Sequence, residues 1–154
     1  MKAFRFPLES LRTLRKQREQ VAQQKYSAAL ARCDEAAQAF RLAETELLTG
    51  HAMLDHELTA GASAARIMNL QTWCKVLDLR RKECVNALVA AQSDANEAFR
   101  AMTTAVRERE ALDKFYEKSR RVWERALLNA EQKIFDELAI QRQHEPAWSG
   151  AFSA

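Results

Sequence analysis

Residues 67–91 read IMNLQTWCKVLDLRRKECVNALVAA, and their spacing predicts the fold of the whole chain. Alternate steps of three and four residues from Ile67 reach Leu70, Cys74 and Leu77, and the same steps continue to residue 137. Sixteen of the 21 positions reached are apolar, against 47% of the whole chain. Apolar residues that recur every three and a half positions form one stripe along a coiled-coil helix. We therefore expect a single helix from about residue 64 to about residue 143.

The rest of the chain also favours helices. Its 154 residues include three glycines and two prolines, and Pro7 and Pro146 lie near the two ends. Most other residues are strong helix formers, and strand-favouring residues never alternate over a useful length. The composition predicts an all-α fold made of few, long elements.

A first helix is expected over about residues 7–58. It opens at Phe6-Pro7-Leu8-Glu9, because proline suits the first helical turn and an early glutamate complements the helix dipole. It ends either at Gly50 or at a turn over about residues 59–63, where Ser63 is a candidate N-cap for the second helix. Its apolar stripe is weaker and shifts by about one position partway along: Leu8, Leu11 and Val21, then Tyr26, Ala29, Cys33, Ala37, Phe40 and Leu47.

Two amphipathic helices joined by a short turn cover their stripes most simply by folding back on each other. The prediction is a long antiparallel two-helix coiled coil, a single domain over residues 1–154 with a flexible tail at 144–154. Leu8 then lies opposite about residue 116, and the second helix outruns the first by about 25 residues. A rival arrangement breaks the second helix near residues 92–96 and forms a three-helix bundle.

The C-terminal overhang carries apolar residues on more than one face, which a solitary helix cannot hide, so we expect a partner there. These residues are Trp123, Leu127, Leu128, Ile134, Phe135, Leu138 and Ile140. Near the turn, Trp73 is either a plug that packs the end of the hairpin or an exposed contact, and the plug is the more usual role.

The residue types needed for catalysis are not arranged in recognisable motifs. There is no glycine-rich phosphate loop, nucleophile elbow or catalytic cysteine and histidine pair. His51 and His56 are five residues apart, which does not suit a metal pair on one helical face. Cys33, Cys74 and Cys84 fall on apolar-stripe positions and are expected to be small core residues in a reducing compartment. We expect no enzyme activity, no metal and no cofactor.

Charge is nearly balanced overall, at +3, but residues 1–25 carry seven basic and two acidic side chains. This cationic end favours an acidic protein surface over nucleic acid, because stacking aromatics are not interleaved with the basic residues. Residues 1–20 hold no uninterrupted apolar stretch that would suit a signal peptide or a membrane span. The protein is expected to be cytosolic.

Both ends of the chain resemble one family. The opening Phe4-x-Phe6-x-Leu8-Glu9-x-Leu11-x-x-Leu14-Arg15, followed by Arg18-Glu19, resembles the start of FliJ, the small coiled-coil component of the bacterial flagellar type III export apparatus. The C-terminal run resembles the other end of that family, through Leu112, Tyr116, Glu131-Gln132 and Asp136-Glu137-Leu138-Ala139.

The resemblance implies a protein similar to the stalk subunit of rotary ATPases, at the cytoplasmic face of the inner membrane. Its partners would be the hexameric export ATPase, the cytoplasmic domain of the export gate protein FlhA, and export chaperones. Contacts with the ATPase ring would fall on Phe4, Leu8, Leu11, Arg12, Arg15, Trp123, Leu127 and Phe135. Contacts with the gate would lie nearer the turn, on Ile67, Leu70, Trp73 and Leu77.

Two other functions fit the same sequence. Injectisome stalk proteins of the YscO type share the shape and role implied for FliJ. A structural coiled coil could instead close its own seam by homodimerisation, since alanines permit close helix approach at Ala91, Ala95, Ala98 and Ala105.

Overall fold

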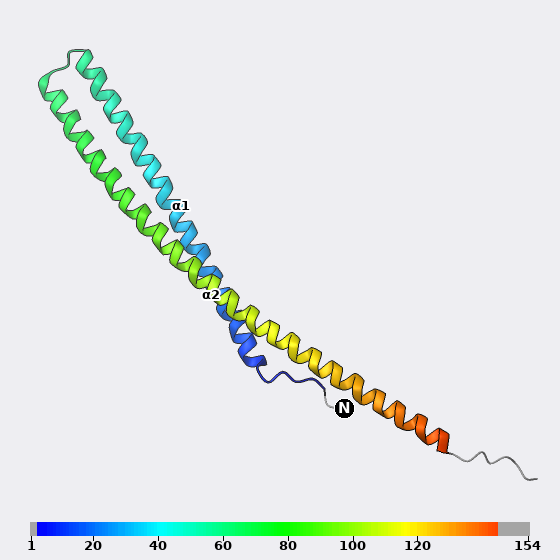
Figure 1. Ribbon diagram of the computed structural model, residues 1–154. Coiled ribbons are helices and arrows are strands. Elements are labelled where there is room, and N and C mark those ends of the chain that lie inside the picture. Colours follow the sequence, from blue (N-terminus) through cyan, green and yellow to red (C-terminus); the bar gives the residue numbers. More distant parts are fainter. Residues whose placement is uncertain (1–2, 145–154) are drawn as a thin grey trace, which may run out of the picture. The chain divides into compact units, whose positions relative to one another are not determined.

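The structure is a computed structural model that describes residues 3–144. It contains two long helices, α1 (Glu9–Thr59) and α2 (Ala64–His144), joined by a short loop (Figure 1). No strand occurs within these residues. The expected helix boundaries of 7–58 and 64–143 are close to these limits. α2 runs unbroken through residues 92–96, so the three-helix bundle is wrong.

Contacts along the chain group into two units, which we describe separately. One unit spans residues 14–109 and contains the loop; the other combines residues 1–13 with residues 110–154. The expectation of a single domain stays a prediction, and the expected tail beyond His144 lies outside the described residues.

The loop is built from two local capping motifs. Gly61 has a φ of 74°, and the N–H of Ala62 donates to the carbonyl of Glu57 at 3.1 Å while Gly61 N–H donates to Leu58 at 3.4 Å. This pattern is a Schellman motif, in which glycine takes the left-handed conformation that ends a helix. Ser63 Oγ then accepts from Arg66 N–H at 3.4 Å, so Ser63 is the N-cap of α2.

Cross-helix pairs in the unit of residues 14–109 establish the antiparallel hairpin. Arg66 pairs with Glu57 next to the loop at 2.8 Å, and Arg80 pairs with Glu46 further away, also at 2.8 Å. The rings of Tyr26 and Phe99 lie 5.4 Å apart. The partners in each pair lie at similar distances from the loop along the two helices, as an antiparallel pairing requires.

The apolar stripe of α2 coincides with its buried face. Every position of the expected stripe from Ile67 to Trp123 is buried or half-buried. Two arginines on that stripe have acidic partners: Arg109 pairs with Glu19, and Arg81 lies 3.5 Å from Asp78. Lys82 also hydrogen-bonds Asp78, which holds the pKa of that carboxyl below its usual value. The seam therefore tolerates charge where a counter-charge lies beside it.

The stripe of α1 differs from expectation in its first turns. Leu8, Leu11 and Val21 are exposed, and the half-buried positions in these turns include Arg12, Arg15 and Glu19. Arg15 pairs with Glu108, and Glu19 with Arg109. Charged pairs therefore occupy the seam in these turns, and the neighbouring apolar side chains are exposed beside it.

Gly50 does not end α1 but lies buried in the middle of the hairpin seam. A Cβ placed on it would stand 3.0 Å from Leu77 Cδ1 and 3.4 Å from Cys74 Sγ. The absence of a side chain therefore allows α2 to approach closely here.

Enlarging this residue should destabilise the hairpin. Gly50→Leu is expected to lower the free energy of unfolding by about 2 kcal/mol, because the new side chain collides with Leu77. Gly50→Ala should be nearly neutral, since a helix-propensity gain of about 1 kcal/mol offsets the tight contact. Urea unfolding followed by circular dichroism measures both, and a Gly50→Leu protein as stable as the parent would contradict this packing.

Candidate protein-binding surfaces

The N-terminal segment is held on α2 by aromatic side chains. Phe6 is buried, and its ring centroid lies 5.1 Å from that of Tyr116 and 5.8 Å from that of Phe115. Phe4 lies 5.7 Å from Tyr116 and 5.8 Å from Trp123. Edge-to-face and tilted pairs at these separations stabilise beyond simple burial. Phe4 and Trp123, both predicted to contact an ATPase ring, are thus in contact with each other.

Arg12 adds a charged contact to this aromatic cluster. Its guanidinium lies 4.2 Å from the centre of the Tyr116 ring, and its Nε donates to Asp113 Oδ1 at 2.7 Å. The hydrogen bond with Asp113 raises the pKa of Arg12 above its already high ordinary value, and a guanidinium over an aromatic ring forms a cation–π contact. The cation fastens the start of α1 to α2.

Large apolar side chains near the end of α2 are exposed to solvent. All described side chains from Glu131 to Arg142 are exposed, and Phe135 retains 70% of its accessible surface. Three further large apolar residues in that run are exposed: Ile134, Leu138 and Ile140. Leu127 is half-buried, whereas Leu128 next to it is exposed. Several large exposed apolar side chains in one short segment are typical of an interaction site.

The remaining residues predicted to contact the ATPase ring are Leu8, Leu11 and Arg15. Leu8, directly before α1, and Leu11, in its first turn, are both exposed. Arg15 belongs to the unit of residues 14–109, where Glu108 pairs with it. The predicted set therefore contains packed, ion-paired and freely exposed side chains, and its role stays a prediction.

The four residues predicted for the export gate also divide by burial. Leu77 is buried, Ile67 and Leu70 are half-buried, and Trp73 keeps 54% of its surface exposed. The preferred role of Trp73 as a plug is wrong. Trp73 directly precedes Cys74, whose side chain is buried in the seam. The neighbouring indole therefore points away from the buried face. There it lines a shallow groove with Thr49, Met53, Arg80 and their neighbours.

The described residues were compared with the patterns of metal-binding clusters and of membrane-spanning helices. Within 3–144, no group of three or more His, Cys, Asp or Glu side chains is placed to hold a metal ion. His51 and His56 are exposed, whereas the side chain of His144 lies outside the description. Cys74 is buried, and Cys33 and Cys84 are half-buried, all three as free thiols on the seam. Over the same range, neither helix has a segment both long and apolar enough to cross a bilayer.

The two long helices define a coiled-coil hairpin, and both helices carry large exposed apolar residues. The family model described as "Flagellar FliJ protein" matches residues 4–147, nearly the whole chain. The chain belongs to the FliJ family and is a component of the flagellar export apparatus, a role that is non-enzymatic in this family. Comparison with curated proteins gave no significant match, and comparison with solved structures gave none.

Proposed function

We propose that this chain is the central stalk of the export ATPase ring, in the cytoplasm at the inner-membrane face. In this role it promotes assembly and turnover of the hexamer, contacts the cytoplasmic domain of FlhA and escorts empty export chaperones. The observation that carries the proposal is the exposed apolar surface of α2 around Leu128 and Phe135. Exposed apolar surface of this kind is typical of a protein contact site. Membership of the FliJ family points to the export ATPase as the partner.

The aromatic cluster supports the same function. Phe4, Phe6 and Arg12 fasten the start of the chain to Asp113, Tyr116 and Trp123 of α2. Such packing stiffens the part of α2 that leads to the exposed segment, because two packed segments bend less than one. A stiff support suits a stalk that must hold its end in a ring.

Mixing the purified chain with the purified export ATPase tests the proposal. The fraction of ATPase in hexamers, measured by mass photometry, and the rate of ATP hydrolysis should both rise. If neither quantity changes across a saturating range of the chain, the stalk function is wrong.

The homodimer alternative is less well supported. Its motivation was a set of alanines that would meet a second copy, but Ala95 is buried and Ala91, Ala98 and Ala105 are half-buried on the α2 stripe. Within the hairpin this stripe already faces α1. These alanines therefore have their close helix neighbour in the same chain.

For the export gate, we expect Trp73→Ala to weaken binding to the FlhA cytoplasmic domain about tenfold without changing stability. The indole is largely exposed, so its loss removes contact area from a partner and little from the hairpin. Leu77→Ala is the matched comparison: it should destabilise the hairpin by about 2 kcal/mol, because Leu77 is buried. Calorimetric titration and thermal unfolding separate these outcomes, and unchanged gate affinity of Trp73→Ala would remove Trp73 from the contact.

A further inference from the structure

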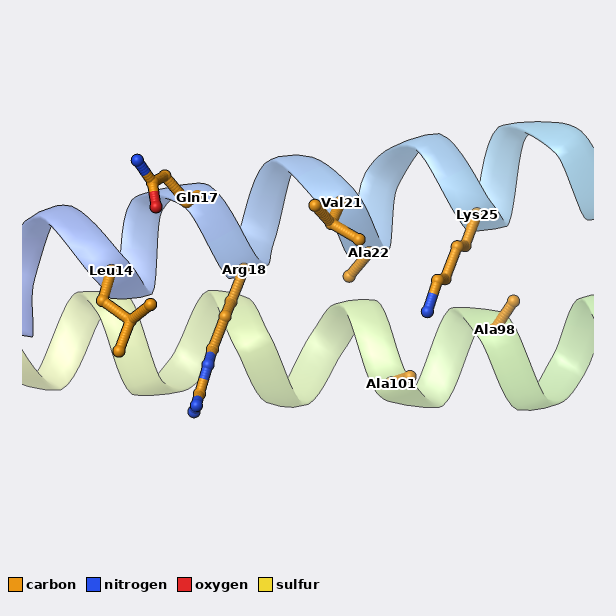
Figure 2. Close-up of a pocket in the computed structure, with 8 residues that line it drawn as sticks. All are labelled: Leu14, Gln17, Arg18, Val21, Ala22, Lys25, Ala98 and Ala101. Atoms are coloured by element: carbon orange, nitrogen blue, oxygen red, sulfur yellow. The ribbon is translucent and has the colours of Figure 1, made fainter.

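A groove between α1 and α2 lies in the unit of residues 14–109 and shares no lining residue with the surfaces assigned above. Figure 2 shows the side chains that line it, and its volume is about 480 Å³. We call it the basic groove. Its lining residues are Leu14, Gln17, Arg18, Val21, Ala22 and Lys25 of α1 with Ala98 and Ala101 of α2.

The apolar part of the basic groove is not covered by the hairpin. Leu14 and Val21 keep 41% and 48% of their surfaces exposed. They flank a seam that the pairs Arg15–Glu108 and Glu19–Arg109 occupy, which is why these two apolar side chains lie outside it. The other apolar residues of the lining are alanines, so the backbone of a further helix can approach closely.

The rim of the groove is cationic. Arg18 and Lys25 are seven residues apart on α1, and in Figure 2 both side chains extend from α1 toward α2. Neither has an ion pair with another residue in the described part of the chain, in contrast with Arg15 and Arg109 nearby. The lining itself contains no acidic residue, and Asp94 and Glu97 belong to the adjoining groove, which Lys25, Ala98 and Ala101 also line.

We propose that the basic groove binds an amphipathic helix of a partner protein that carries acidic residues about seven positions apart. Apolar side chains of that helix would cover Leu14, Val21 and the alanines, as a third helix covers a two-helix seam. Its acidic side chains would meet Arg18 and Lys25 at the spacing that these cations already have. The proposal does not depend on the stalk function, because it uses none of the residues assigned to the ATPase or to the gate.

Nucleic acid fits the same groove less well. Binding of nucleic acid relies on phosphate contacts supplemented by stacking on aromatic side chains. No aromatic residue lines this groove, and leucine, valine and alanine make up most of its apolar surface. The lining therefore favours a protein helix.

A synthetic acidic helix tests the proposal directly on the full chain. The probe is a fluorescently labelled peptide of about three heptads, with leucine at the two seam positions and glutamate at the flanking positions. Fluorescence anisotropy should show saturable binding, and the charge-reversed lysine peptide should not bind. Arg18→Glu combined with Lys25→Glu should weaken binding about tenfold or more.

A matched double variant controls for total charge. Lys16→Glu with Lys75→Glu changes the net charge equally at two exposed sites outside the groove, so peptide affinity should stay near that of the parent. Ala101→Arg blocks the groove independently, because Ala101 is exposed and lies on its α2 side. This variant should also weaken peptide binding. Thermal unfolding confirms that each variant is folded.

Three results would overturn the proposal. One is equal peptide affinity of the groove double variant and its charge control; another is no saturable binding by the parent chain. The third is a parent that dimerises in sedimentation, or binds duplex RNA more tightly than the peptide, with either property lost on Arg18→Glu/Lys25→Glu. That result would assign the groove to a second copy of the chain or to nucleic acid.

Discussion

Placing aspartate at both Leu128 and Phe135 is expected to reduce the stimulation of the export ATPase about tenfold or more, while the hairpin stays folded. Both side chains are exposed, so their replacement costs the isolated protein little. In a ring, the same positions would bury large apolar side chains, and a buried charge without a partner is strongly unfavourable there. The measurement is ATP hydrolysis at increasing concentrations of each variant.

Leu48→Asp is the control for this double variant. Leu48 is 66% exposed and Leu128 is 63% exposed, so the two leucines lose similar contacts inside the chain. Leu48 lies on α1 in the unit of residues 14–109 and is not among the residues assigned to the ATPase. Equal loss of stimulation from Leu48→Asp would mean that general surface polarity, and not the end of α2, governs the effect.

A second large effect is expected at the seam of the hairpin. Ala29 is 2% exposed, and the groove beside it is lined by acidic Asp94 and Glu97 as well as by basic Lys25 and Arg32. Ala29→Asp should destabilise the protein by about 3 kcal/mol, because a carboxylate at this buried position is desolvated. Thermal unfolding by circular dichroism should show a melting temperature well below that of the parent.

The neighbouring residue separates burial from helix propensity. Ala28 is exposed, so Ala28→Asp carries the same propensity cost of well under 1 kcal/mol without the desolvation. The difference between the two variants therefore measures the seam itself. Similar melting temperatures for both would contradict the antiparallel packing.

The sequence predicted α2 and the turn well because regular patterns specified them. The apolar stripe keeps one spacing from Ile67 to Trp123, so only one face of the helix can be buried. Gly61 and Ser63 carry local capping chemistry, which depends on nearby backbone groups alone. These features need no knowledge of the rest of the fold.

The first turns of α1 could not be predicted in the same way. Leu11 and Val21 suggested an apolar seam, but Arg15 and Glu19 occupy it because Glu108 and Arg109 lie opposite. Those counter-charges lie about 90 positions away along the sequence. Charge at a seam position is interpretable only once the register between the helices is known.

The apolar pattern of the sequence also did not predict which residues near the loop are buried. Gly50 looked like a possible helix end, but its close contact with Leu77 keeps it inside α1. Trp73 looked like a plug because it is large and close to the turn, although its position beside Cys74 points it off the seam. Uncovered cations on a groove rim, such as Arg18 and Lys25, give no sequence signal distinct from a solvated surface.

We propose above all that the exposed end of α2 touches the export ATPase. The most direct measurement places a photo-crosslinking amino acid at Phe135 in one sample and at Leu48 in another, each mixed with the purified ATPase. We predict that illumination joins the chain to the ATPase from position 135 and not from position 48. Crosslinking from position 48 alone, or from neither position at saturating ATPase, would contradict the account.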